Sequence, residues 1–182
     1  MLRKGLIILM TVMLADGSGL IAQVAWQPLL ASHPRLERVH SPESLSKFMR
    51  KNFKFVEDAE NFGKVDYWQS PEAMLGRKKG DCEDFALFAH AALTELGIES
   101  HVISMYGKNQ FAHTVTVFKH EGKYRVINDG KLKKYDTKNL EDALSKVEPN
   151  WTWAAYTERR NDRGWMNEIF YNPAFQPHQA QI

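Results

Sequence analysis

The single cysteine, Cys82, is the residue whose position best suits nucleophilic chemistry. It follows Asp81, a typical helix N-cap, and begins a stretch whose apolar residues recur every three or four positions, as on one helix face. Unpaired backbone N–H groups and the helix dipole lower the pKa of a thiol at such a position and can stabilise an oxyanion. The sequence predicts a reactive thiol, and the plainer alternative is a buried, inert cysteine.

A cysteine nucleophile needs a histidine as general base and a third group that orients the imidazole. His113 begins a strand of alternating apolar and polar residues, and it shares a face with Val115 and Val117, which we expect to point toward the cysteine helix. A three-residue hairpin loop would then place Asp129 opposite His113. Asp129 is the predicted third group and Asn128 the second choice, because a four-residue loop would shift the register by one.

Three segments together resemble the transglutaminase-like superfamily, and in particular its bacterial cysteine-peptidase branch. They are GDCEDFA at 80–86, AHTVTVF at 112–118 and YRVINDG at 124–130. The resemblance covers residues 40–147, in the order Cys, His, Asp expected for this papain-like fold. It implies Cys82 as nucleophile, His113 as general base and Asp129 as orienting acid, although the family usually has its acid where this chain has Asn128.

The segment WQSPE at 68–72 also fits this branch, and its first two residues, Trp68 and Gln69, are candidates for substrate contacts.

Three carboxylates flank the cysteine, namely Asp81, Glu83 and Asp84. At the start of a helix they cap the backbone and complement the dipole, which is the interpretation that we favour. The alternative is a calcium site, because calcium prefers carboxylate oxygens and some relatives in this branch depend on calcium. The spacing is not that of an EF-hand, and no two histidines have the spacing of zinc ligands, so the sequence indicates no required cofactor.

The order of the predicted elements indicates an α+β fold, with helices first and an antiparallel sheet after them. The cysteine helix should pack on the sheet that carries His113 and Asp129. Predicted helices begin at Ser41-Pro42, cover 72–75 with an end at Gly76, run from 82 to a stop at Gly97, and cover 140–147; predicted strands cover 98–106, 113–118 and 124–127. We expect the tail aromatics after Pro149 to pack on the sheet edge or the helix layer.

The first 25 residues read as an export signal or an N-terminal anchor. A short basic start is followed by the apolar run Gly5–Ala15, which is too short to span a bilayer by itself. Residues 26–182 should form one domain, with a core at 40–147 and an aromatic-rich extension at 148–182. We therefore expect a periplasmic or extracellular protein that meets a membrane only through an uncleaved N-terminal segment.

The functional prediction is a thiol hydrolase that cleaves a peptide or amide bond through a thioester. The 182 residues carry a formal net charge of +2 with scattered lysines and arginines, so nucleic acid is not an implied partner. A protein or peptide substrate is what the resemblance implies. The same residues could transfer the acyl group to an amine, as a transglutaminase does. A non-catalytic binding domain with this fold is the remaining alternative, although binding alone would need none of the three residues.

Overall fold

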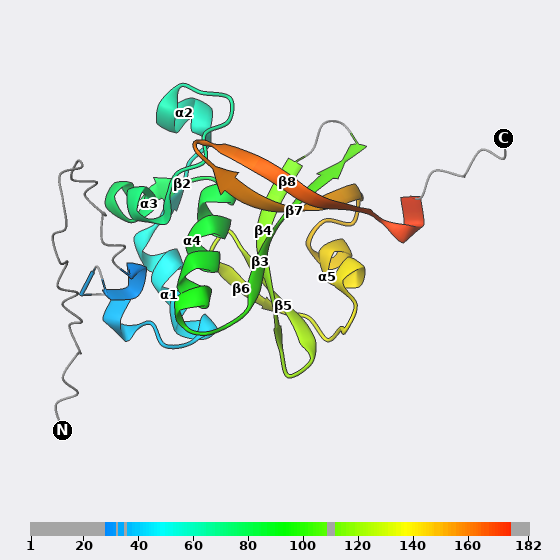
Figure 1. Cartoon of the computed structure of the whole chain (residues 1–182), viewed down its shortest axis with the longest axis horizontal. Helices are drawn as coiled ribbons and strands as arrows, with labels where there is room; N and C mark the ends of the chain where they lie inside the picture. Colours follow the sequence, from blue (N-terminus) through cyan, green and yellow to red (C-terminus); the bar gives the residue numbers. More distant parts are fainter. Residues whose placement is uncertain (1–27, 32, 35, 109–111, 176–182) are drawn as a thin grey trace, which may run out of the picture.

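A computed structural model describes residues 28–31, 33–34, 36–108 and 112–175, and the export segment predicted at 1–25 lies outside these ranges (Figure 1). The described chain forms helices followed by an antiparallel sheet, which confirms the predicted α+β fold. The helices are η1 (Leu29–Ala31), η2 (Leu36–Arg38), α1 (Pro42–Asn52), α2 (Asp58–Phe62), α3 (Pro71–Arg77), α4 (Cys82–Glu95), α5 (Leu140–Val147) and η4 (Pro173–Phe175).

Six strands form the main sheet in the order β6-β5-β4-β3-β7-β8, and every neighbouring pair is antiparallel. They are β3 (Ser100–Gly107), β4 (Ala112–His120), β5 (Lys123–Asn128), β6 (Lys131–Lys134), β7 (Trp151–Arg160) and β8 (Arg163–Tyr171). A separate parallel pair joins β1 (Lys54–Phe55) to β2 (Lys79–Gly80) just before the cysteine helix. Strand β4 therefore lies inside the sheet, with β5 and β3 on either side.

Helix boundaries follow the local signals in the sequence. Ser41 caps α1 in a reciprocal capping box with Ser44, and α5 covers the predicted range 140–147. Helix α3 differs from the prediction, because it runs through Gly76 to Arg77 and is followed by the C-cap residue Lys78, which adopts a positive φ of 60°. Gly97, with a φ of 74°, follows the end of α4 as predicted.

Helix α4 packs on the face of β4 that carries its threonines. The Thr116 hydroxyl, which is fully buried, donates a 2.6 Å hydrogen bond to the Ala86 carbonyl of α4. Val115 and Val117 belong instead to the cluster that includes Leu144 of α5. The prediction that the strand face shared by His113, Val115 and Val117 points toward the cysteine helix is therefore wrong, because the sheet is covered on both sides and this face lies on the α5 side.

The tail after Pro149 adds two strands to the sheet beside β3, which the sequence did not predict as strands. Trp151 is fully buried in the cluster under α5, whereas Trp165 and Tyr171 of the edge strand β8 are exposed. Part of the aromatic tail thus belongs to the sheet itself. Across the described residues, the model has no helix with both the length and the apolar character that a membrane crossing requires.

One hydrogen-bonded link from α1 holds the turn between β5 and β6. The Ser46 hydroxyl is buried, donates to the Gly130 carbonyl at 2.8 Å and accepts from the Leu132 N–H at 3.0 Å. Asp129, a predicted site residue, lies in this turn and has a positive φ of 45°. Helix α1 therefore fixes the backbone at the end of β5.

We predict that Ser46→Ala lowers the free energy of unfolding by about 1–3 kcal/mol, because it removes the partner of two main-chain polar groups at a buried position. Thr94→Ala is the control, since the Thr94 hydroxyl bonds only to the His90 carbonyl on the exposed side of α4. Urea unfolding of both variants measures the difference. Equal stability of the two variants would show that Ser46 does not hold the turn.

Candidate active site

Cys82 is the first residue of α4, and its side chain lies against the start of β4. The thiol donates a hydrogen bond to Glu83 Oε2 at 3.2 Å, and Sγ accepts one from the backbone N–H of Thr114. Thr114 directly follows His113 on β4. The structure therefore brings the predicted nucleophile to the residue next to the predicted base.

The electrostatic surroundings of Cys82 differ from the sequence prediction of a low-pKa thiol. Burial raises the pKa of the Cys82 thiol, and the negative charge of the Glu83 carboxylate raises it further. The Thr114 N–H opposes this change, because its hydrogen bond favours the thiolate. The helix N-terminus alone therefore does not make a thiolate here while neighbouring carboxylates are charged.

His113 is held by the neighbouring strand. A 2.9 Å hydrogen bond joins its Nε2 to Oδ1 of Asn128, at the end of β5. The predicted pairing of residues 113 and 129 is wrong, because the hairpin loop has two residues, Glu121 and Gly122, instead of three. Both loop residues have positive φ, as the type I′ turn of a two-residue hairpin loop requires.

Asp129, the predicted third group, lies one residue beyond the end of β5. Its Oδ1 is buried and has no hydrogen-bond partner. Burial raises the pKa of the Asp129 carboxyl, while the nearby charges of His113 and Lys131 lower it. Asp129 is thus electrostatically close to His113, but the hydrogen bond to the ring comes from Asn128.

Trp68 and Gln69 support the cysteine helix from inside the protein. The Gln69 backbone and side-chain amides both donate to the Asp84 carboxylate of α4, the backbone bond at 2.8 Å. A Cβ atom at Gly80 would overlap that carboxylate, so this close approach requires glycine. Trp68 is 5% exposed and packs against Ala86 and Leu87 in another part of α4. Both residues thus hold α4 in place, and their contact with a substrate stays a prediction.

Three buried carboxylates beside Cys82 lie close enough to share a cation. Asp58, Asp81 and Glu83 each contribute an oxygen atom within 4.8 Å of the others. Asp58 Oδ1 and Asp81 Oδ1 are buried without a hydrogen-bond partner. Burial raises the pKa of Asp58 to about 6 and also raises the pKa values of Asp81 and Glu83. A group of hard oxygen ligands, two of them without a hydrogen-bond partner, fits a calcium ion.

This group differs from the predicted one in a single member. Asp84 lies outside it, because Gln69 holds the Asp84 carboxylate, and Asp58 replaces it. Asp58 follows β1 just as Asp81 follows β2, and these parallel strands pair Phe55 with Gly80. Strands of two residues carry too little pattern to be predicted, so no signal in the sequence pointed to Asp58.

A family model described as a transglutaminase-like domain matches residues 36–151, which is more than half of the chain. This chain belongs to the transglutaminase-like domain family. The match confirms the resemblance carried by the Cys82, His113 and Asn128-Asp129 segments.

Solved structures that resemble this transglutaminase-like domain include LapG from Legionella pneumophila. It has 20% identity and a TM-score of 0.44 over 69% of this chain and 66% of LapG, just under two thirds of that protein. A calcium-bound form of the same protein has 19% identity and a TM-score of 0.45 over 76% of this chain and 74% of that one. A TGase has 17% identity and a TM-score of 0.40 over 65% of this chain but only 35% of its own length. These weak likenesses add no weight to the family match, and no curated protein matches the chain.

We predict that the metal-free domain loses stability as the pH rises from about 4 to about 6. A carboxyl with a raised pKa binds more protons in the folded state than in the unfolded one. Its contribution to the free energy of unfolding is therefore fully present below the unfolded pKa. It is lost as the pH rises through the folded pKa, which is about 6 for Asp58. Asp58→Asn should flatten this part of the profile. Thermal unfolding in a chelating buffer measures it, with the exposed Glu60→Gln as control.

If Asp58→Asn and Glu60→Gln give the same pH profile as the unchanged protein, burial does not raise the pKa of Asp58 in the folded state.

Proposed function

We propose that this transglutaminase-like domain is a thiol hydrolase of peptide or amide bonds, with Cys82 as nucleophile and His113 as general base. The observation that carries the proposal is the 2.9 Å hydrogen bond between His113 and Asn128. It holds the His113 imidazole next to Thr114, the residue whose backbone N–H contacts Cys82, the only cysteine of the chain. Inert core cysteines need no such neighbour.

The chemistry follows from the positions of these groups. Cys82 Sγ attacks the carbonyl carbon of the substrate, and His113 accepts the thiol proton. Backbone N–H groups at the start of α4 can then donate to the oxyanion. When the carbon–nitrogen bond breaks, His113 gives the proton to the leaving amine, and a thioester on Cys82 remains. Water attacks that thioester with His113 again as base, which releases the acid and restores the thiol.

Asn128 is the third group that we favour. Its Oδ1 engages Nε2 of His113, so Nδ1 is the ring nitrogen that would exchange the proton with Cys82. An amide can orient an imidazole as a carboxylate does, and Cys-His-Asn sets occur in papain-like proteases. Asp129 lies close enough to stabilise the imidazolium through its charge. In this proposal Asn128 orients the ring and Asp129 supplies charge.

The Glu83 carboxylate, while it is charged and accepts the hydrogen bond of the thiol, disfavours the Cys82 thiolate that the reaction needs. We propose that Asp58, Asp81 and Glu83 hold a calcium ion, since they lie together and two of their buried oxygens have no hydrogen-bond partner. When bound, the ion supplies positive charge that offsets these carboxylates beside the thiol. Cys82 itself stays outside this group.

We further propose that the domain acts outside the cytoplasm on a protein or peptide substrate. The proposal is supported by the basic start and the apolar run Gly5–Ala15, which are typical of export signals. A lone cysteine in an oxidising compartment is also easier to explain if its thiol is used. An uncleaved segment would keep the domain at the membrane surface.

We predict that Cys82→Ser and His113→Ala abolish hydrolysis, and that Asn128→Ala lowers kcat at least about tenfold, because the imidazole loses the group that orients it. Asn128→Asp should keep most activity, since a carboxylate can accept the same hydrogen bond. Asp129→Ala should cost less than Asn128→Ala. Cleavage of a mixed peptide library, followed by mass spectrometry with calcium present, measures all five variants.

A larger loss from Asp129→Ala than from Asn128→Ala would make Asp129 the orienting group. If Cys82→Ser has no effect on any cleavage, the binding-domain alternative replaces the enzyme. Incorporation of a dansylated amine into the peptides in place of hydrolysis would indicate acyl transfer.

We predict that calcium raises the Tm of the protein and that Asp58→Asn or Glu83→Gln removes most of this increase, since each change takes away one charged ligand. The exposed Glu60→Gln should retain the full increase. Thermal unfolding at pH 7, with and without calcium after chelation, measures the effect. An equal increase in all variants would place the ion elsewhere.

A further inference from the structure

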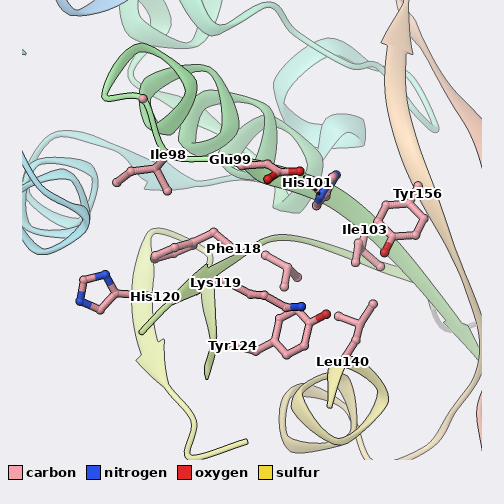
Figure 2. Close-up of a pocket in the computed structure, with 12 residues that line it drawn as sticks. Ile98, Glu99, His101, Ile103, Phe118, Lys119, His120, Tyr124, Leu140 and Tyr156 are labelled. Carbon is pink, nitrogen blue, oxygen red and sulfur yellow. Dashed lines mark ion pairs between the residues drawn. The ribbon is translucent and has the colours of Figure 1, made fainter. Parts of the chain in front are cut away.

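A second hollow lies on the α5 side of the sheet, remote from the cysteine. It has a volume of about 490 Å³, within the range of roughly 300–1,000 Å³ that small-molecule pockets occupy. Figure 2 shows its side chains converging from the sheet, from Leu140 and from the segment that follows α4. Lys119, on its wall, lies five residues along β4 from Thr114, or about 16 Å along the strand. This hollow is therefore separate from the candidate active site.

Strand register places six of the residues that line the hollow on one sheet face. They form three cross-strand pairs. They are His101 with Val117, Ile103 with Tyr156, and Lys119 with Tyr124. Residues directly opposite one another in a sheet point to the same side, so these side chains share the face of the cluster under α5.

The floor of the hollow is apolar and its sides are aromatic. Ile103 and Val117 are each 1% exposed and form the floor, and Tyr124 and Tyr156 are half-buried at the sides. The His101 ring meets the Tyr156 ring edge-on, with 5.1 Å between the ring centroids. A flat apolar group would lie over the two aliphatic side chains and between the two tyrosines.

The rim of the hollow carries charge of both signs in separate places. Lys119 extends over the Tyr124 ring, with its Nζ 5.0 Å from the ring centroid, as Figure 2 shows. Glu99 lies on the far side of the rim and pairs with His101 at 3.8 Å. An acidic group on a bound molecule would thus be attracted to Lys119 and kept away from Glu99.

We infer that this hollow binds an aromatic carboxylate, with the ring between Tyr124 and Tyr156 and the carboxylate at Lys119. Such a group is presented both by a small free aromatic acid and by the C-terminal residue of a peptide. The inference does not depend on the function of Cys82, because no residue is shared between the two sites.

Titration of the 15N-labelled full chain with N-acetylphenylalanine tests the inference, and Cys82→Ser serves to exclude any contribution from the active site. The amides of 99–103, 117–124 and 156 should shift together and saturate. The uncharged amide of the same compound should bind about fivefold more weakly, which is the scale of an exposed ion pair. Lys119→Met should reduce the affinity for the acid to that of the amide, Lys119→Arg should preserve it, and the exposed Lys51→Met, near the end of α1, should not change it.

Phenylacetate and a tripeptide ending in phenylalanine distinguish the two sources of the carboxylate. Tighter binding of the tripeptide identifies a peptide end as the ligand, and equal binding identifies a free acid, both within the inferred chemistry. Equal affinity for acid and amide, an unchanged affinity in Lys119→Met, or saturable shifts confined to other residues would overturn the inference, as would the absence of saturation.

Discussion

The structure around the candidate site depends on the burial of the first turn of α4. This turn brings a thiol and three carboxylates into the interior, where charged groups are costly unless they are paired or hydrogen-bonded. Asp84 is satisfied by the two amide groups of Gln69, which can approach because residue 80 is glycine. Asp81 and Glu83 receive no such pair of amide hydrogen bonds, and with Asp58 they form a group of carboxylates beside Cys82.

Burial raises the pKa of the Cys82 thiol, and the negative charge of Glu83 in this group adds to the effect. A helix N-terminus contributes about half a positive charge, which the full negative charge of a neighbouring carboxylate outweighs at close range. The position of the thiol at the start of α4 therefore does not by itself lower its pKa. The sheet provides the other half of the site, since β4 and β5 hold His113 and Asn128 and the turn after β5 is fixed by Ser46.

Much of this arrangement could be predicted from the sequence. Some signals are local, namely the caps at Ser41 and Asp81, the periodicity of α4 and the alternation in β4. They located the helix that begins at Cys82 and the strand that carries His113. Features that depend on pairing could not be read in the same way. A loop of two residues instead of three moved the register of β5 by one, so that Asn128 lies opposite Val115, on the strand face of His113, and bonds to the His113 ring in place of Asp129. Asp58 reaches the site through a pair of two-residue strands, and the valines of β4 face α5 because both sides of the sheet are covered.

The measurement that tests the central claim most directly is the alkylation rate of Cys82 by iodoacetamide near neutral pH, with calcium present. The rate reports the thiolate without any knowledge of the substrate. The account predicts rapid alkylation of the unchanged protein, a large decrease in His113→Ala, and a smaller decrease in Asn128→Ala. Slow alkylation that is the same in all three proteins would contradict it, because Cys82 would then be an ordinary buried thiol.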